Sequence, residues 1–190
     1  FDDFLLSDIV LKNNSSITDL TITGNGDVTM DVEDELYGLN NKNYVLNNLT
    51  VSGMTRWQGD VYFADMGLQS GNVTFNDCTL NGLYTLYQGK FVFDGCVING
   101  ETNKYSMMIY ASKDVTFTDC VFNSDNKAIK VFGYGTFLEN AQVNISGTKF
   151  YSSAENNDKA VVEMDLTQQT NPAVDLTIED SFALGFAEGS

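Results

Sequence analysis

Histidine is absent from this chain of 190 residues, and arginine, tryptophan and proline each occur once. The lack of histidine excludes the catalytic triads, metal sites and proton relays that depend on imidazole. No apolar run approaches the roughly 20 residues that a membrane-spanning helix needs. We therefore expect neither histidine-based chemistry nor membrane insertion of this segment.

Basic residues are scarce as well. Ten lysines and arginines stand against 26 aspartates and glutamates, which gives a formal net charge of -16. Nucleic acids and anionic membranes attract basic surfaces, so this balance excludes electrostatic binding to either. An apolar fraction of 43% with only 19% charged residues indicates a folded chain rather than a disordered one.

Three cysteines are an odd number and do not predict a disulfide framework. Asn, Asp, Gly, Thr, Val and Phe are abundant, a composition typical of many short strands joined by turns. The first residue is Phe1, and no leader pattern follows it. We therefore expect a processed or trimmed end, with flanking domains in a longer protein.

A short pattern of apolar residues recurs along the chain at relative positions 0, 2, 5 and 7. Two short strands with alternating sidedness, joined by a two-residue corner, produce this spacing. Upstream, Leu49, Val51 and Met54 fit the first three positions. The other copies are Val73/Phe75/Cys78/Leu80, Phe91/Phe93/Cys96/Ile98, Val115/Phe117/Cys120/Phe122, Val143/Ile145/Thr148/Phe150 and Leu176/Ile178/Ser181/Ala183.

Three strands in each repeat of about 18 to 33 residues predict one coil of a parallel β-helix. A single coil leaves its backbone groups unpaired and its apolar side chains exposed, whereas stacked coils pair the former and bury the latter. The third strand of each repeat is expected at 61–64, 83–87, 106–111, 128–132 and 160–164. Stacking predicts two columns of structural residues, Cys78, Cys96 and Cys120 in one and Asn81, Asn99 and Asn123 in the other.

Segments 72–82, 90–100 and 114–124 share the pattern V-T-F-x-D-C-x-F/L-N. This pattern resembles the right-handed parallel β-helix of the pectate-lyase-like superfamily, in particular the repeat proteins and adhesin-like surface proteins of bacteria. The resemblance implies an all-β chain folded as a single-stranded right-handed parallel β-helix, a solenoid of about six or seven coils. Residues 1–46 would form an N-terminal cap and first imperfect coil, and 47–190 one continuous domain of β-helix repeats.

The two ends of such a solenoid need covers, because a terminal coil exposes apolar surface and unpaired backbone. The expected covers are Phe1, Phe4, Leu5 and Ile9 at the N-terminal end and Phe182, Leu184 and Phe186 at the other.

Sugar-cleaving enzymes of the same superfamily suggest an alternative function, that of a divergent polysaccharide lyase or hydrolase. The resemblance implies a basic residue beside carboxylate-held calcium for a lyase, and clustered aspartates with a histidine for a hydrolase. Neither set is recognisable, because Arg56 is the only arginine and lies beside Trp57 in an irregular repeat. Glu163 and Asp165, with Asp65 on the same expected sheet, are the candidates for acid–base work.

An outward row of aromatic residues is the basis of a binding hypothesis. Alternation within 128–132 points Lys130 and Phe132 outward, and the same register in earlier repeats points Tyr87 and Tyr110 outward. Flat aromatic faces suit sugar rings. The candidate ligand-binding residues are Tyr87, Tyr110, Phe132, Lys130, Glu163 and Asp165.

The long loop at 133–140 raises an alternative for the same row. It contains Tyr134 and Phe137. If it folds over the row, the aromatic rings are buried as a satellite apolar cluster and not displayed for a ligand.

We expect no resident cofactor. Calcium is the one ion that the composition allows, since Asp, Asn and backbone carbonyls supply hard oxygen ligands, but no calcium site is assignable. The cysteines are expected to be buried structural thiols and not metal ligands.

These observations favour a non-catalytic, secreted or cell-surface bacterial module, adhesin-like and binding a glycan or another surface ligand. The alternatives are the divergent polysaccharide-active enzyme and a structural spacer within a larger surface protein. Fold alone does not decide among them.

Overall fold

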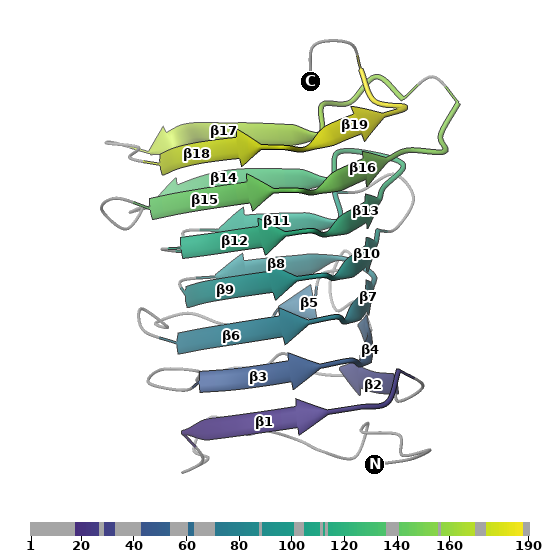
Figure 1. Ribbon diagram of the computed structural model, residues 1–190. Coiled ribbons are helices and arrows are strands. Elements are labelled where there is room, and N and C mark those ends of the chain that lie inside the picture. The colour runs from purple at the N-terminus through teal and green to yellow at the C-terminus, as the bar shows by residue number, and fades with distance from the viewer. Residues whose placement is uncertain are drawn as a thin grey trace.

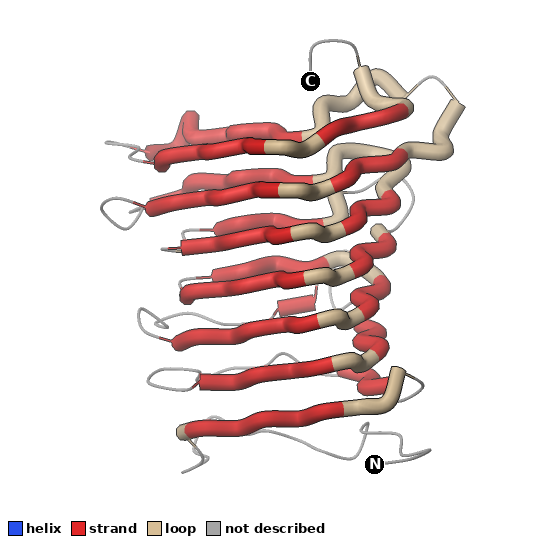
Figure 2. Tube along the Cα trace, in the orientation of Figure 1, coloured by secondary structure: helices blue, strands red, loops and turns tan. Residues whose placement is uncertain are grey.

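The computed structural model describes residues 18–26, 29–32, 43–53, 61–62, 71–87, 89–100, 105–110, 112, 114–135, 141–155, 157–169 and 174–187. Within them the chain forms strands joined by turns, with no helix (Figure 2). The described residues therefore contain no helix that is long and apolar enough to cross a membrane. The expected all-β class is confirmed.

The strands form three sheets, and every pairing within them is parallel. The first sheet contains, in spatial order, β1 (Asp19–Thr23), β3 (Asn43–Asn47), β6 (Gly71–Asn76), β9 (Gly89–Asp94), β12 (Asp114–Thr118), β15 (Ala141–Ser146) and β18 (Val174–Glu179). The second contains β2 (Thr29–Val32), β4 (Thr50–Gly53), β7 (Thr79–Asn81), β10 (Val97–Asn99), β13 (Val121–Asn123), β16 (Lys149–Tyr151) and β19 (Phe182–Leu184). The third contains β5 (Val61–Tyr62), β8 (Tyr84–Tyr87), β11 (Met107–Tyr110), β14 (Ile129–Gly135) and β17 (Val162–Gln169).

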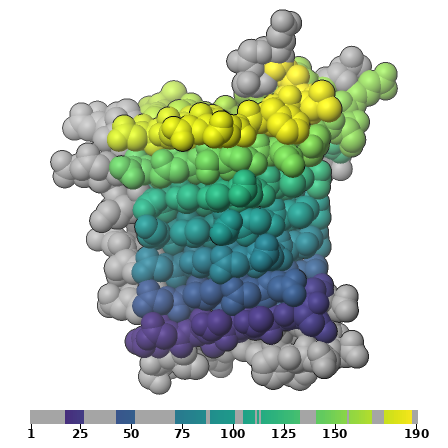
Figure 3. Space-filling model, viewed as in Figure 1, coloured from purple at the N-terminus to yellow at the C-terminus, as the bar shows by residue number. Residues whose placement is uncertain are grey.

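From β3 onward the chain visits the three sheets in rotation. A strand of the first sheet is followed by one of the second and one of the third, and the chain then returns to the first sheet one level higher (Figure 1). The space-filling view shows these levels as bands that follow one another from purple to yellow (Figure 3). The expected three strands per repeat are confirmed, and the arrangement is compatible with a parallel β-helix.

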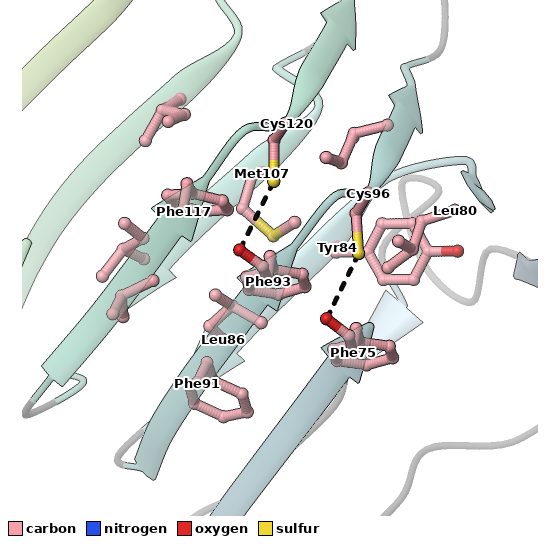
Figure 4. Close-up of a cluster of buried hydrophobic side chains, with 14 of the residues drawn as sticks. Phe75, Leu80, Tyr84, Leu86, Phe91, Phe93, Cys96, Met107, Phe117 and Cys120 are labelled. Atoms are coloured by element: carbon pink, nitrogen blue, oxygen red, sulfur yellow. Dashed lines mark hydrogen bonds between the residues drawn. The ribbon is translucent and has the colours of Figure 1, made fainter. Parts of the chain in front are cut away.

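The interior is built from equivalent positions of successive repeats. Phe75 pairs in register with Phe93, and Phe93 with Phe117. Their rings stack with centroids 4.9 Å apart at both steps, and all three side chains are fully buried. Parallel pairing places the same position of the repeat at each level, so these three rings stack as a continuous column within the core. Figure 4 shows this column beside Tyr84, Leu86 and Met107, which are buried residues of the third sheet.

The corner between the first two strands of a repeat needs a left-handed backbone. Asp77 and Asp119 have φ of 51° at this corner, while Gly95 and Gly147 have φ of 63° and 60°. Glycine adopts this region without strain, and Asp and Asn tolerate it better than other residues. The recurring pattern at positions 0, 2, 5 and 7, called the template below, has Asp or Gly at these corners. Its residue types therefore account for the corners at 76–77, 94–95, 118–119 and 146–147.

The expected register of the upstream copy is wrong. Tyr44 and Leu46 pair with Val73 and Phe75, so the copy begins at Tyr44 and not at Leu49. Leu49 and Val51 then occupy the third and fourth positions, and both are buried. The physical reason is the corner, because Asn48 adopts a φ of 53° there. Met54 lies outside the described residues.

The C-terminal level differs from its expected form. Phe182 is 49% exposed and Leu184 is 65% exposed, so neither covers the core. The residue between them, Ala183, pairs with the buried Phe150, which places its two neighbours on the outer face. Of the three expected covers, Phe186 alone packs against the core.

The expected N-terminal cover, Phe1, Phe4, Leu5 and Ile9, lies outside the described residues. Strand β3 contains the boundary between 1–46 and 47–190. Strands β1 and β2 belong to the same two sheets as the repeats that follow.

Candidate functional site

The asparagine column runs along the end of the second sheet. Asn81, Asn99 and Asn123 share one register position. The Asn99 Nδ2 group donates to Asn81 Oδ1, and the Asn123 Nδ2 group donates to Asn99 Oδ1, each at 2.8 Å. These amide bonds run along the stacking axis and join successive levels outside the core.

The cysteine column lies just after the corner of three consecutive levels. Cys78, Cys96 and Cys120 are buried and carry free thiols. Figure 4 shows the Cys96 Sγ group donating to the Phe75 carbonyl and the Cys120 Sγ group donating to the Phe93 carbonyl, at 3.3 and 3.4 Å. Each thiol therefore binds a carbonyl of the level below.

In the next two levels the position of the cysteines is occupied by residues with a hydroxyl group, Thr148 and Ser181. Thr148 Oγ1 donates to the carbonyl two residues before it at 3.0 Å, and Ser181 Oγ does the same at 2.7 Å. The cysteine thiols make the same local bond, as in the contact of Cys120 with the Thr118 carbonyl. This position of the repeat therefore needs a small side chain that donates a hydrogen bond, and a hydroxyl serves as well as a thiol.

The thiols of Cys78 and Cys96 are not activated for nucleophilic or redox chemistry, whereas a hydrogen bond with Cys96 lowers the pKa of Cys120. The hydrogen bond with Cys120, together with burial, raises the pKa of Cys96 to about 12 despite an opposing hydrogen bond with Cys78. The hydrogen bond with Cys96 and burial also raise the pKa of Cys78. A protonated buried thiol is a poor nucleophile and a poor metal ligand. Among the described residues no group of three or more Cys, Asp or Glu side chains could hold a metal ion.

The aromatic row lies on the third sheet. Tyr87 pairs in register with Tyr110, Tyr110 with Phe132, and Phe132 with Asp165. The rings of Tyr110 and Phe132 are half-buried, with centroids 5.5 Å apart and planes inclined by 35°. The buried residues Ile109 and Val131 point to the core, so these rings face outward.

The loop expected to cover the row is described only in part. Residues 133–135 belong to β14, and Tyr134 pairs with Gln168 after a register shift. Phe137 and the rest of the loop lie outside the described residues. Whether 133–140 folds over the row therefore stays a prediction.

A cluster of four charged residues lies beside the row: Lys127, Lys130, Glu163 and Asp165. The Lys130 ammonium is 3.3 Å from Glu163 Oε1, 3.3 Å from Asp165 Oδ2, and 5.0 Å from the centre of the Phe132 ring. Lys127 forms a second ion pair with Glu163. Strand alternation predicts three members of this cluster but not Lys127, which lies 36 residues before Glu163 in the chain.

These ion pairs determine what the two carboxylates can do. Partial burial works to raise the pKa of Glu163, but hydrogen bonds from Lys127 and Lys130 outweigh it and hold the pKa below its ordinary value. Hydrogen bonds from Thr167 and Lys130 also lower the pKa of Asp165. A general acid at neutral pH needs a raised pKa, so neither group suits that role. Asp65, Arg56 and Trp57 lie outside the described residues.

The outer face of the third sheet is not uniform along the stack. At β8 the Thr85 side chain is fully buried, and its Oγ1 atom has no hydrogen-bond partner within the described part of the chain. At β14 the Lys130 side chain is 20% exposed, and at β17 the Asp165 side chain is 31% exposed. Among the described residues of this face, the accessible charged groups lie on β14 and β17. No pattern in the sequence distinguished Thr85 from its neighbours.

Similarity to known proteins gives no indication of function for this chain. The chain matches no protein-family model, no curated protein sequence and no solved structure.

Proposed function

We propose that this chain is a non-catalytic, secreted or cell-surface module that binds a glycan through the outer face of its third sheet. The proposal includes the finer description of the fold, a single-stranded right-handed parallel β-helix of the pectate-lyase-like kind, similar to bacterial adhesin-like proteins. The rotation of the chain through three parallel sheets supports that description.

The proposal depends on one observation: the rings of Tyr110 and Phe132 lie next to each other and face outward. The apolar C–H faces of a sugar pack well on such rings. Charged groups at the edge of the rings, Lys130 and Asp165, supply donors and acceptors for sugar hydroxyls. An aromatic platform with adjacent polar groups is the usual composition of a site that binds a polar ring.

The pairing of the charges favours binding over catalysis. Glu163 and Asp165 are held by two ammonium groups, and this arrangement stabilises both carboxylates in their ionised form. Fixed ionised groups can orient hydroxyls without exchanging protons with them. The non-catalytic role therefore fits the electrostatics better than an acid–base pair does.

The test is a glycan array followed by calorimetric titration of the best oligosaccharide found. Replacing Tyr110 by Ala is expected to weaken binding about tenfold, because one stacking surface is lost. Lys149→Ala is the control, since Lys149 is exposed on the second sheet, and it should leave the affinity unchanged. Failure of every glycan to bind, or equal affinities for wild type and Tyr110→Ala, would overturn the proposal.

A further inference from the structure

We propose that a hollow at the end of the asparagine column binds a single neutral sugar residue through two adjacent hydroxyls. The hollow has a volume of about 280 Å³, and its lining includes Asn123, Asp125, Tyr151 and Ser153. It lies at the second sheet, away from the aromatic row of the third. The inference rests on the proposed glycan-binding function and adds a separate site with a defined class of sugar.

The hollow exists because the asparagine column stops. The position after Asn123 is occupied by Tyr151, which pairs with it in register. Asn99 Oδ1 accepts the amide of the next asparagine, whereas Asn123 Oδ1 accepts no hydrogen bond from the described residues. The last amide of the column therefore presents an unfilled acceptor beside a tyrosine ring.

Asp125 supplies a second acceptor with a fixed position. Its Oδ1 atom accepts the Ser153 backbone N–H at 3.0 Å and the Ser153 hydroxyl at 2.9 Å. Its Oδ2 atom accepts no hydrogen bond from the described part of the chain, where Asp125 also has no ion pair. A carboxylate that is oriented by one oxygen and open at the other is well suited to accept a ligand hydroxyl.

Main-chain bonds hold the lining in place before any ligand binds. The Gly100 N–H donates to the Asn123 carbonyl, and the Ser124 N–H donates to the Tyr151 carbonyl, both at 2.9 Å. These bonds continue the parallel pairing of the second sheet into the turns. Pre-organisation of this kind lowers the entropic cost of binding.

Tyr151 forms the aromatic wall. The Phe182 ring packs edge-on against it, with centroids 5.7 Å apart and planes inclined by 82°, which restrains the ring. The small volume suits one sugar ring and not an oligosaccharide. The Asp125 carboxylate and the net charge of -16 oppose a sugar acid, so the expected ligand is a neutral pyranoside.

The test is an NMR titration that follows backbone amides with methyl glycosides of glucose, mannose, galactose and galacturonic acid. We expect at least one neutral glycoside to shift the amide signals of Gly100, Ser124 and Ser153. Binding is expected in the millimolar range, as suits about two hydrogen bonds and one stacking contact. Galacturonate should bind at least about tenfold more weakly than the neutral galactoside.

Asp125→Asn is the most informative variant, because the Asn oxygen can still accept the two bonds from Ser153 while the free charged acceptor is lost. It should weaken binding by about tenfold or more. Asp175→Asn removes the same charge from an exposed position of β18 and should have no effect. Tyr151→Ala should also weaken binding, with the unfolding temperature recorded to exclude loss of the fold.

Two outcomes would overturn this inference: no shift at these amides with any glycoside, or unchanged affinity in Asp125→Asn. Preference for galacturonate would overturn the assigned class of sugar. Failure here is distinguishable from failure of the proposed function, because Tyr110→Ala acts on the third sheet and should leave these amide shifts unchanged. Array binding that is lost in Tyr110→Ala but retained in Asp125→Asn would support the first proposal alone.

Discussion

The middle of the stack and its C-terminal end use the same template but differ in burial. Phe117, at β12, is fully buried, whereas Ile178, two levels further along the same register column, is 50% exposed. Phe117 has a level on either side, while no described strand lies beyond β18 in the first sheet. The template therefore determines whether a side chain points toward the core or away from it. The presence of a further level on each side determines how deeply that side chain is buried and how much stability it adds.

The largest expected effect is a charge placed in the middle of the column. Phe117→Asp should unfold the protein, at a cost of more than about 4 kcal/mol, because a carboxylate would replace a buried ring that stacks on Phe93 and meets Phe122 edge-on. Thr116→Asp adds the same charge to the adjacent outward position and should cost about 1 kcal/mol or less. Circular dichroism during urea unfolding measures both, and a folded Phe117→Asp variant would contradict the stacked core.

A matched pair of isoleucines tests the difference between the two regions directly. Ile145 and Ile178 pair in register, but the first is 1% exposed and the second 50% exposed. Ile145→Ala should cost about 2 to 5 kcal/mol through the lost contacts and the cavity, and Ile178→Ala less than about 1 kcal/mol. Equal free energies of unfolding would mean that the C-terminal level is covered in solution.

The asparagine column should add a smaller increment outside the core. Asn99→Ala removes two amide bonds and is expected to lower the free energy of unfolding by about 1 to 2 kcal/mol. Asn144→Ala is the control, because its half-buried side chain makes no hydrogen bond with the described residues. If the two variants were equally stable, the bonds along the column would contribute nothing.

The smallest effect concerns the ion pairs on β17. The two lysines hold the pKa of Glu163 below its ordinary value of 4.5, so the stabilisation is complete above that pH and is lost as pH falls through the lowered pKa. Glu163→Gln should reduce the acid sensitivity of unfolding by less than about 1 kcal/mol, since the pair is partly exposed. Glu155→Gln, at an exposed position without an ion pair among the described residues, should leave the acid sensitivity as it is in the wild type.

Much of the fold could be predicted because the template combines two independent signals. Apolar residues alternate along the strands, and the corners carry Asp, Asn or Gly where a left-handed backbone is needed. The upstream copy is the exception, because the apolar spacing alone also fits a copy that begins at Leu49. The corner at Asn48 sets the actual register, which begins at Tyr44.

The candidate site was less predictable. Strand alternation is enough to place Tyr110 and Phe132 at one register position. The contact of Lys127 with Glu163 and the hollow around Asp125 depend on turns of variable length. Such turns have no periodicity, so their contacts do not follow from spacing along the chain.

The whole fold depends on the parallel, in-register pairing of equivalent residues in successive repeats. Cross-strand nuclear Overhauser effects measure this pairing directly between β10 and β13. We expect contacts that join Val97 to Val121, Ile98 to Phe122 and Asn99 to Asn123, in that order. Contacts in the reverse order, joining Val97 to Asn123 and Asn99 to Val121, would show antiparallel pairing and contradict it.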